Sequence, residues 1–326
     1  MKHKRNWFSI LFGLGLFLFT GYLLADTFLI PRAYAVVTDH EETATAAQVT
    51  ATPEAMEITA TPAAVEITAE AATATAAPAV SEPIRTETSY TDGNILVELS
   101  TYRLLDTTVY VADVQLSSPD YLKTAFANST YGRNITEKTS AIASSVDAIL
   151  AVNGDYYGAQ RSGYVIRNGV LYRNESSGGE DLVIYADGTF GIVDESEVTA
   201  ESLLESGAWN VLSFGPALVQ NGAVAVSEKE EVGRAMASNP RTAIGVIDDL
   251  HYVFVVSDGR TGESDGLSLY ELAGFLQSLG VETAYNLDGG GSSSIVFLGS
   301  VINNPVNGRR SSERSVSDIV YIGYSA

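Results

Sequence analysis

The chain has 326 residues, with 40 Asp and Glu against 19 Lys and Arg, a formal net charge of −21 and no cysteine. This acidic balance argues against a nucleic-acid partner, because a polyphosphate backbone is bound mainly through basic side chains. The lack of cysteine excludes disulfides, thiolate zinc sites and cysteine nucleophiles. Of three histidines, only His251 lies in sequence of globular composition. We therefore expect chemistry based on carboxylates, hydroxyls, amides and arginines.

Residues 1–35 combine a basic flank with an apolar run. Residues 2–5 read K-H-K-R, and the 19 residues at 7–25 carry no charge. This pattern is typical of an export signal, and the A-Y-A triplet at 33–35 has the form of a cleavage site. The run is also close to the ~20 residues that span a bilayer. The sequence leaves open a cleaved signal peptide and an uncleaved membrane anchor, and both predict an extracellular or cell-surface location.

Residues 36–88 consist almost entirely of Ala, Thr, Glu, Val, Ile and Pro. A nine-residue repeat is visible in T-A-T-P-E-A-M-E-I at 50–58 and T-A-T-P-A-A-V-E-I at 59–67. A segment of this composition buries too little apolar surface to offset the entropy of ordering it. We predict a disordered linker that acts as a stalk.

Residues 89–326 have a globular composition and are predicted to form one domain. Alternating apolar residues predict paired strands, for example at 107–116 and at 181–192. Helical periodicity is clearest at 269–279, where Ser268 is a natural N-cap. Strands dominate, so we predict an α+β fold. It would contain a twisted mixed or largely antiparallel sheet with a few packed helices.

Polar side chains gather beside glycine at the ends of the predicted strands. N-G-D at 153–155 follows an apolar strand, and N-L-D-G-G-G-S at 286–292 follows another. Glycine at such positions lets a ligand approach main-chain N–H groups closely. A single Asn-Gly or Asp-Gly is explained equally well by an ordinary turn. The triple glycine exceeds what a turn requires, and it lacks the Lys of a phosphate-binding P-loop.

Six segments of the globular part resemble, in their order and spacing, the phosphodiester glycosidase family. They are N-G-D-Y-Y at 153–157, F-G-P-A-L-V at 214–219, N-P-R-T-A-I-G at 239–245, D-G-R at 258–260, G-L-S-L-Y-E-L-A at 266–273 and N-L-D-G-G-G-S at 286–292. The closing segment R-S-V-S-D at 314–318 also resembles the end of the family's domain. The resemblance spans residues 95–321. It implies a hydrolase that cleaves the bond between the anomeric carbon and the phosphate oxygen of sugar-1-phosphodiesters, and the N-terminal segment predicts that this hydrolase is exported. The implied partner is a carbohydrate phosphodiester of envelope glycans or exopolysaccharide.

Such a reaction needs carboxylates near the anomeric carbon and donors for the departing phosphate. We predict Asp288 as the first catalytic carboxylate and Glu271 as the second. An alternative for Glu271 is structural, because S-x-x-E at 268–271 is the pattern of a helix capping box. Arg241 is the predicted phosphate-binding group, since its planar guanidinium matches phosphate oxygens. A salt-bridged strand residue is the alternative for Arg241.

The other predicted substrate contacts are amides, acids, a tyrosine face and main-chain N–H groups. They are Asn153, Asp155, Tyr156, Asp258, Asn286, Gly289, Gly290, Gly291 and Ser292. For Asp155 and Asp258 a structural alternative also stands, in which each carboxylate orders its own loop.

Two further questions stay open in the sequence. Converging acidic loops would suit Ca²⁺, which binds oxygen ligands, but no spacing demands a metal and we assign no cofactor. The alternative function is a non-catalytic glycan-binding module on a cell-surface stalk.

Overall fold

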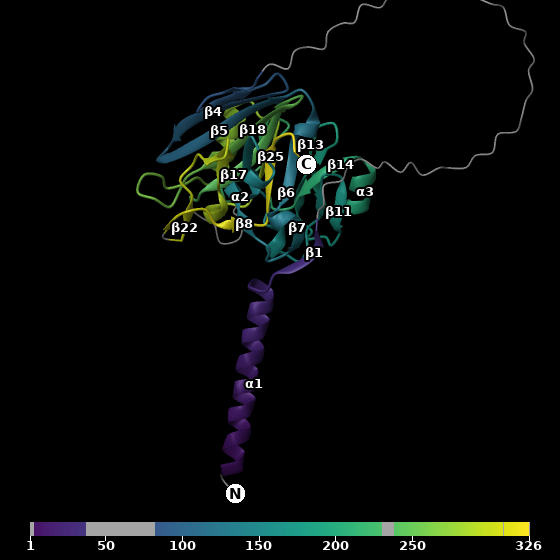
Figure 1. Ribbon diagram of the computed structural model, residues 1–326, viewed down its shortest axis with the longest axis vertical. Coiled ribbons are helices and arrows are strands. Elements are labelled where there is room, and N and C mark those ends of the chain that lie inside the picture. Colours follow the sequence, from purple (N-terminus) through teal and green to yellow (C-terminus); the bar gives the residue numbers. More distant parts are fainter. Residues whose placement is uncertain (1–2, 37–81, 230–237, 309, 326) are drawn as a thin grey trace, which may run out of the picture.

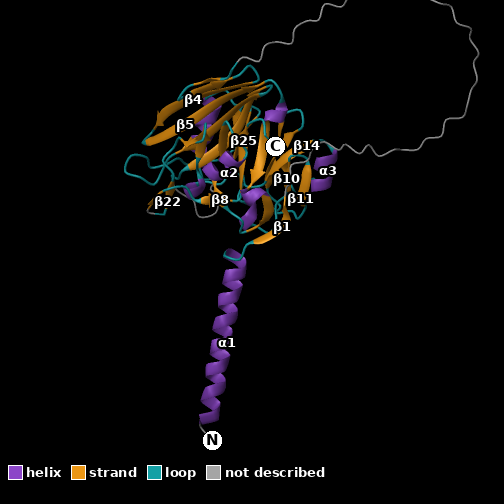
Figure 2. Ribbon diagram, in the orientation of Figure 1, coloured by secondary structure: helices purple, strands orange, loops and turns teal. Residues whose placement is uncertain are grey.

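The computed structural model describes residues 3–36, 82–229, 238–308 and 310–325 (Figure 1). Most of the predicted linker therefore lies outside the described residues. Within them strands greatly outnumber helices (Figure 2), and every pair of neighbouring strands is antiparallel. The prediction of an α+β fold with a largely antiparallel sheet is confirmed.

The largest sheet has nine strands in the order β16-β15-β19-β17-β18-β5-β4-β3-β2. They are β2 (Ile84–Arg85), β3 (Ser89–Thr91), β4 (Ile95–Leu104), β5 (Thr107–Leu116), β15 (Ala217–Gln220), β16 (Ala223–Val224), β17 (Arg241–Asp248), β18 (His251–Ser257) and β19 (Thr283–Asn286). The predicted strand at 107–116 is β5. Strand β2 falls inside the predicted linker, so the sheet begins before residue 89.

Two five-stranded sheets accompany it. One has the order β21-β20-β9-β25-β6, with β6 (Leu122–Phe126), β9 (Leu150–Asn153), β20 (Ile295–Phe297), β21 (Ser300–Val301) and β25 (Asp318–Ile322). The other has the order β11-β10-β14-β12-β13, with β10 (Val165–Arg167), β11 (Val170–Arg173), β12 (Glu180–Tyr185), β13 (Phe190–Asp194) and β14 (Ala208–Leu212). The predicted hairpin at 181–192 is β12–β13.

Three two-stranded sheets complete the strand pairing. Strand β1 (Arg32–Val36) pairs with β7 (Thr130–Arg133), β8 (Glu137–Lys138) with β24 (Ser315–Val316), and β22 (Val306–Asn307) with β23 (Arg310–Ser311). The α-helices are α1 (His3–Phe28), α2 (Thr139–Ser145), α3 (Ala200–Glu205) and α4 (Leu269–Ser278). The predicted helix at 269–279 is α4, with Ser268 as its N-cap.

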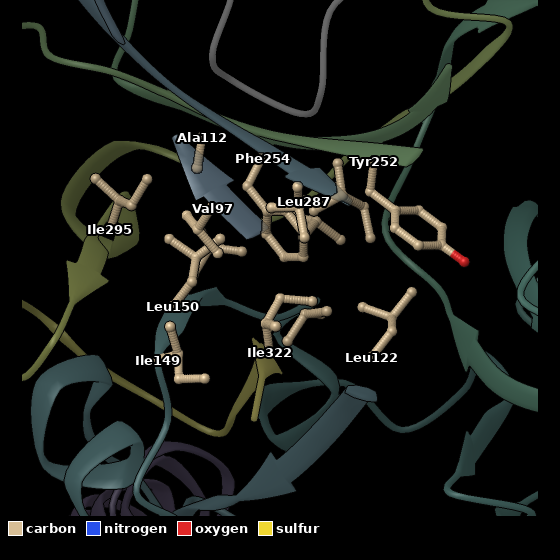
Figure 3. Close-up of a cluster of buried hydrophobic side chains, with 14 of the residues drawn as sticks. Val97, Ala112, Leu122, Ile149, Leu150, Tyr252, Phe254, Leu287, Ile295 and Ile322 are labelled. Carbon is tan, nitrogen blue, oxygen red and sulfur yellow. The ribbon is translucent and has the colours of Figure 1, made fainter. Parts of the chain in front are cut away.

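The main core lies between the nine-stranded sheet and the sheet of β9 and β25. Figure 3 shows side chains of β5 and β18, such as Phe254, facing those of β9 and β25, such as Leu150 and Ile322. Full burial of each such side chain contributes roughly 1.5–3 kcal/mol. A second cluster joins the apolar face of α4 to the opposite side of the large sheet. The strand ends that carry the polar motifs are thus fixed by packing on both faces.

Helix α1 projects from the strand-rich body at the place where β1 joins it (Figure 1). Strand β1 is held at the edge of β7, and Asn134 Nδ2 donates to the carbonyl of Ile30 at 3.1 Å. Among the residues that the structure describes, no helix combines the length and the apolar character needed to cross a membrane. The signal peptide and the anchor therefore both stay predictions.

A buried carboxyl on β12 makes stability depend on pH. Asp181 is fully buried, and neither of its carboxyl oxygens has a hydrogen-bond partner among the described residues. Burial, together with the negative charge of Glu195, raises the pKa of Asp181 to about 9. The folded chain therefore keeps a proton that the unfolded chain releases near its ordinary value of ~3.9.

We expect the free energy of unfolding to fall as the pH rises from about 4 to about 9, by up to ~1.4 kcal/mol per pH unit from this group. Urea unfolding at pH 5 and pH 8 measures the slope. Asp181→Asn should flatten it, whereas Asp106→Asn, at an exposed turn, should not. An unchanged slope in Asp181→Asn would show that this carboxyl is not the source.

Candidate active site

The structure brings two of the predicted motifs together. Asn153 ends β9, and its Nδ2 donates to the carbonyl of Asp288, which follows β19, at 2.6 Å. The N–H of Asp288 donates in turn to the carbonyl of Gly154 at 3.2 Å. Thr242 of β17 donates to Asn153 Oδ1 at 2.8 Å. Asn153 is fully buried. Its side chain therefore does not face solvent, and it holds the Asp288 loop in place from the interior of the domain.

Asp288 is a largely buried carboxylate with two strong donors. Its Oδ2 accepts hydrogen bonds from Ser292 Oγ at 2.6 Å and from Arg314 Nη2 at 2.6 Å, and the residue is 8% exposed. Burial raises the pKa of Asp288, and the Arg314 charge and the Ser292 hydroxyl offset only part of that rise. A carboxylate with a raised pKa is a better base than a solvated one, and such groups are common at catalytic sites.

The three glycines after Asp288 pass close to backbone and to arginine side chains. A Cβ at Gly289 would lie 2.9 Å from the carbonyl oxygen of Pro240. Gly290 has φ +63°, and a Cβ there would lie 3.0 Å from Arg260 Nη2. A Cβ at Gly291 would lie 3.5 Å from the side chain of Arg314. In the turn η4 (Gly290–Ser292) and just before it, glycine is therefore required at 289 by the Pro240 carbonyl and at 290 by the Arg260 guanidinium, whereas a Cβ at 291 would lie at ordinary van der Waals distance.

These two arginines, Arg260 and Arg314, are site residues that sequence reasoning missed. Arg260 is exposed, and its Nε and Nη2 donate to Asn239 Oδ1 at 3.0 and 2.7 Å. The Arg314 guanidinium lies over the ring of Tyr156, 5.8 Å from the ring centre, and Tyr156 is 43% exposed. The sequence contains Arg260 in the D-G-R segment at 258–260 and Arg314 in the closing R-S-V-S-D segment at 314–318. Neither segment indicates that the two side chains meet at the same turn.

Arg241 occupies a different environment. It is 3% exposed at the start of β17, and its Nε donates to the carbonyl of Leu267 at 2.8 Å. Its buried guanidinium binds the loop that leads into α4. The predicted phosphate contact of Arg241 stays a prediction, while the more exposed cations near the glycine turn are Arg260 and Arg314.

Glu271 forms the capping box of α4. Its Oε2 accepts from the N–H and the Oγ of Ser268 at 2.8 and 2.9 Å, and Ser268 Oγ accepts from the N–H of Glu271 at 3.2 Å. The structural alternative for this residue is therefore realised in the structure. One carboxylate oxygen is used twice at the start of the helix.

We expect Glu271→Gln to keep both stability and activity, because glutamine makes the same cap. Glu271→Ala should lower the free energy of unfolding by about 1 kcal/mol. Chemical denaturation and an activity assay on both variants check this. A loss of activity of 100-fold or more in Glu271→Gln would instead establish the predicted catalytic role, on the scale of general acid–base catalysis, about 10²–10⁴-fold.

The remaining predicted polar contacts lie beneath the surface and hold loops. Asp258 accepts from the N–H of Asn304 at 2.9 Å and from the Tyr110 hydroxyl at 3.2 Å. Asn286 Nδ2 donates to the carbonyl of Gly215 at 2.8 Å. Both residues are buried. Their side chains hold the neighbouring loops through hydrogen bonds in the interior. Because neither side chain is exposed, the structure does not support their predicted contact with substrate.

Asp155 belongs to a buried ionic cluster. Arg167 Nη2 lies 2.9 Å from Asp155 Oδ2 and 2.8 Å from Asp318 Oδ2, and all three side chains are buried. Asp155 also accepts from the N–H of Ser213 at 2.8 Å. A Cβ at Gly154 would lie 2.1 Å from Asp318 Oδ1, which explains the glycine of the N-G-D motif. Asp155 thus has the loop-ordering role that was its alternative.

No group of three or more His, Cys, Asp or Glu side chains suited to a metal ion occurs among the described residues. The described residues therefore offer no ligand set for Ca²⁺.

Comparison with known proteins agrees with the resemblance seen in the motifs. A model of the phosphodiester glycosidase family matches residues 147–323. N-acetylglucosamine-1-phosphodiester alpha-N-acetylglucosaminidase is 31% identical over 173 residues in Mus musculus and 32% over 189 residues in Homo sapiens. These matches cover 48% and 53% of this chain. The SPbeta prophage-derived protein YomE of Bacillus subtilis is 31% identical over 212 residues, 63% of this chain.

The matched part spans about a third of the length of these curated relatives, at 33%, 36% and 32% respectively. Among solved structures, the auto-inhibited catalytic domain of the zebrafish enzyme of the same name aligns with a TM-score of 0.57 and 22% identity. That alignment covers 71% of this chain and 83% of the zebrafish chain. A hypothetical protein from Synechocystis aligns with a TM-score of 0.54 and 17% identity, over 70% of this chain and 62% of its own.

At these identities the solved structures establish the fold. The family model covers more than half of the chain and includes the N-G-D-Y-Y, D-G-R and D-G-G-G-S segments. The chain therefore belongs to the phosphodiester glycosidase family.

Proposed function

We propose that this chain hydrolyses sugar-1-phosphodiesters at the bond between the anomeric carbon and its phosphate oxygen. The observation that carries the proposal is the Asp288 carboxylate, with its raised pKa, bound to Arg314 beside the glycine turn. Arg260 adds a second guanidinium at the same turn. A carboxylate and two cations at one glycine turn suit a reaction that attacks carbon and expels phosphate.

In the proposed reaction the Asp288 carboxylate acts as a general base toward water. The water oxygen bonds to the anomeric carbon, and the bond from that carbon to the phosphate oxygen breaks. The proton passes from water to Asp288 and then to solvent, and the product phosphomonoester leaves with the bonding electrons. Arg260 and Arg314 stabilise its negative charge, and the exposed face of Tyr156 supports the sugar ring. Main-chain N–H groups of Gly289–Ser292 are additional donors.

A panel of synthetic sugar-1-phosphodiesters, assayed in water enriched in oxygen-18, tests this reaction. We expect reducing sugar to appear together with phosphomonoester, with the heavy oxygen on the sugar. Label on the phosphate would show cleavage of the phosphorus–oxygen bond and would contradict the proposal. Saturable binding of the diesters without any turnover would instead favour the glycan-binding alternative.

We also propose that the chain acts outside the cytoplasmic membrane, on envelope glycans or exopolysaccharide. The basic flank and apolar run within residues 1–35 support export. Protease treatment of intact cells, with detection of the domain by antibody, tests the location. Full protection in intact cells, with digestion after lysis, would contradict it.

A further inference from the structure

A cavity of about 540 Å³ lies beside β7 and the turn η3 (Tyr157–Ala159). None of the predicted substrate contacts lines it, nor do Arg260 and Arg314. Its position is close to the point where α1 and β1 meet the domain, because Asp26, Arg32 and Tyr34 form part of its lining. It is therefore a feature separate from the Asp288 site.

The charge of this cavity is opposite to that of the chain. The chain as a whole has 40 acidic side chains against 19 basic ones. The charged residues of the cavity lining are Arg32, Arg133, Arg161, Arg173, Asp26 and Glu175. Arg32 is paired with Asp26, so the other three guanidinium groups, those of Arg133, Arg161 and Arg173, line the cavity with one further carboxylate, that of Glu175. In an acidic protein this excess of cations suits an anionic ligand.

Arg173 gives the most direct indication of a bound anion. It is 8% exposed, and its Nε and Nη1 donate only to main-chain carbonyls, those of Gly163, Tyr157 and Gln160. Its Nη2 has no hydrogen-bond partner among the described residues. A buried cation with only neutral partners is costly. An anion in the cavity that it lines would supply the missing charge and the missing acceptor.

Aromatic rings form another part of the wall. Tyr131 and Tyr157 are stacked, with ring centres 5.4 Å apart and planes at 16°. The ring centres of Tyr172 and Tyr34 lie 4.9 and 5.8 Å, respectively, from the ring centre of Tyr131. Tyrosine presents both an apolar face and a hydroxyl, a combination that suits the faces and hydroxyls of a sugar ring.

The N-terminal segment supplies one side of the cavity. Strand β1 pairs with β7, with Ala33 opposite Gly132 and Ala35 opposite Tyr131, and it carries Arg32 and Tyr34. A Cβ at residue 132 would lie 2.0 Å from the carbonyl oxygen of Arg32. Glycine at this position therefore permits the close approach of β1.

We propose that this cavity is a second binding site, specific for a phosphorylated saccharide, and that it is complete only while β1 lies against β7. The phosphate contacts the guanidinium groups, and the sugar contacts the rings of Tyr34 and Tyr172, which are more exposed than the stacked rings of Tyr131 and Tyr157. This binding does not depend on the activity proposed above, because it is measured without turnover.

The test uses the full chain, whose lack of cysteine allows a single reporter thiol. Gln160→Cys places that thiol in the cavity lining, and its rate of alkylation by a maleimide is measured with added probes. We expect α-D-glucose 1-phosphate to slow alkylation saturably, and at lower concentration than inorganic phosphate. Methyl α-D-glucoside should not slow it. Thr101→Cys, exposed on β4, should be alkylated at the same rate throughout.

Three variants in the Gln160→Cys background locate the contacts. Arg161→Gln and Tyr172→Ala should each raise the half-protecting concentration of glucose 1-phosphate about tenfold, on the scale of a lost ionic or ring contact. Gly132→Val, which excludes β1, should raise it at least as much. Arg103→Gln, at an exposed position, is the control.

The proposal is overturned if glucose 1-phosphate gives no protection, or if the neutral glycoside protects equally well. Protection by inorganic phosphate at the same concentration as glucose 1-phosphate would refute recognition of a saccharide. An unchanged half-protecting concentration in both Arg161→Gln and Gly132→Val would place the binding elsewhere. Arg161 is exposed, so its variant keeps the test valid even if Gly132→Val does not fold.

Discussion

Asp288→Asn is expected to lower kcat/KM for a sugar-1-phosphodiester by about 10³-fold or more, since a positioned base contributes roughly 10²–10⁴-fold. The loss should fall on kcat, because the amide oxygen can still accept the bonds from Ser292 and Arg314 while the group no longer takes a proton. Release of reducing sugar measures the effect. Circular dichroism and the melting temperature of the variant show that the fold is kept.

The same carboxyl should set the acidic limb of the pH profile. Since the folded site raises the pKa of Asp288, activity should increase with pH through that raised value as the carboxylate forms. Ser292→Ala removes a hydrogen bond that lowers the pKa, so the limb should move to higher pH. Asp113→Asn, a carboxylate on β5 bonded to His251, should leave the profile in place. Near wild-type kcat in Asp288→Asn would exclude this residue as the base.

Local patterns in the sequence were enough for the elements but not for their arrangement. The apolar stripe and the N-cap predicted α4, and alternation predicted β5 and the β12–β13 hairpin. The sheet order depends on pairs far apart in the chain. For example, β9 (Leu150–Asn153) lies beside β25 (Asp318–Ile322). No periodicity encodes such partners, because strand pairing is decided by long-range packing.

The pairing of β1 with β7 was also beyond the sequence. Residues 32–36 have the composition of a processing site, and their partner strand lies about a hundred residues later. Residues 36–88 were predicted to be a disordered linker between the signal or anchor segment at 1–35 and the domain at 89–326. In the structure, strands at both ends of the residues 37–81 gap pair with the domain: β1 with β7, and β2 with β3.

At the site, the sequence identified the acidic motif but could not predict which of the arginines would be exposed to substrate. Arg241, Arg260 and Arg314 each stand in a segment shared with the family. Their exposure differs because β17 is central in its sheet, whereas the other two lie in connecting segments. Exposure of a single side chain is a property of the tertiary structure. The S-x-x-E pattern, by contrast, is local, and for that reason it predicted the observed cap at Glu271.

Arg167→Met is expected to lower the free energy of unfolding strongly. Arg167 is the shared partner of Asp155 and Asp318, and its Nη1 also donates to the carbonyls of Ile166 and Val211. Methionine fills a similar volume but leaves two buried carboxyls without a counter-charge. Loss of one partner from a buried ionic cluster costs about 3–5 kcal/mol. Urea unfolding at pH 8 should show a loss of this size, and Arg103→Met, at an exposed position, should show little.

The sign of the pH dependence separates this explanation from a simple packing defect. Burial and the negative charge of Asp155 raise the pKa of Asp318, so this carboxyl takes up a proton at a higher pH than an ordinary aspartate does. Protonation removes one of the unpaired charges, and the cost of Arg167→Met should therefore be smaller at pH 5 than at pH 8. Adding Asp318→Asn to Arg167→Met should recover part of the loss at pH 8, because the double variant buries one charge fewer. A loss that is equal at both pH values, with no recovery in the double variant, would mean that packing and not charge makes Arg167 necessary.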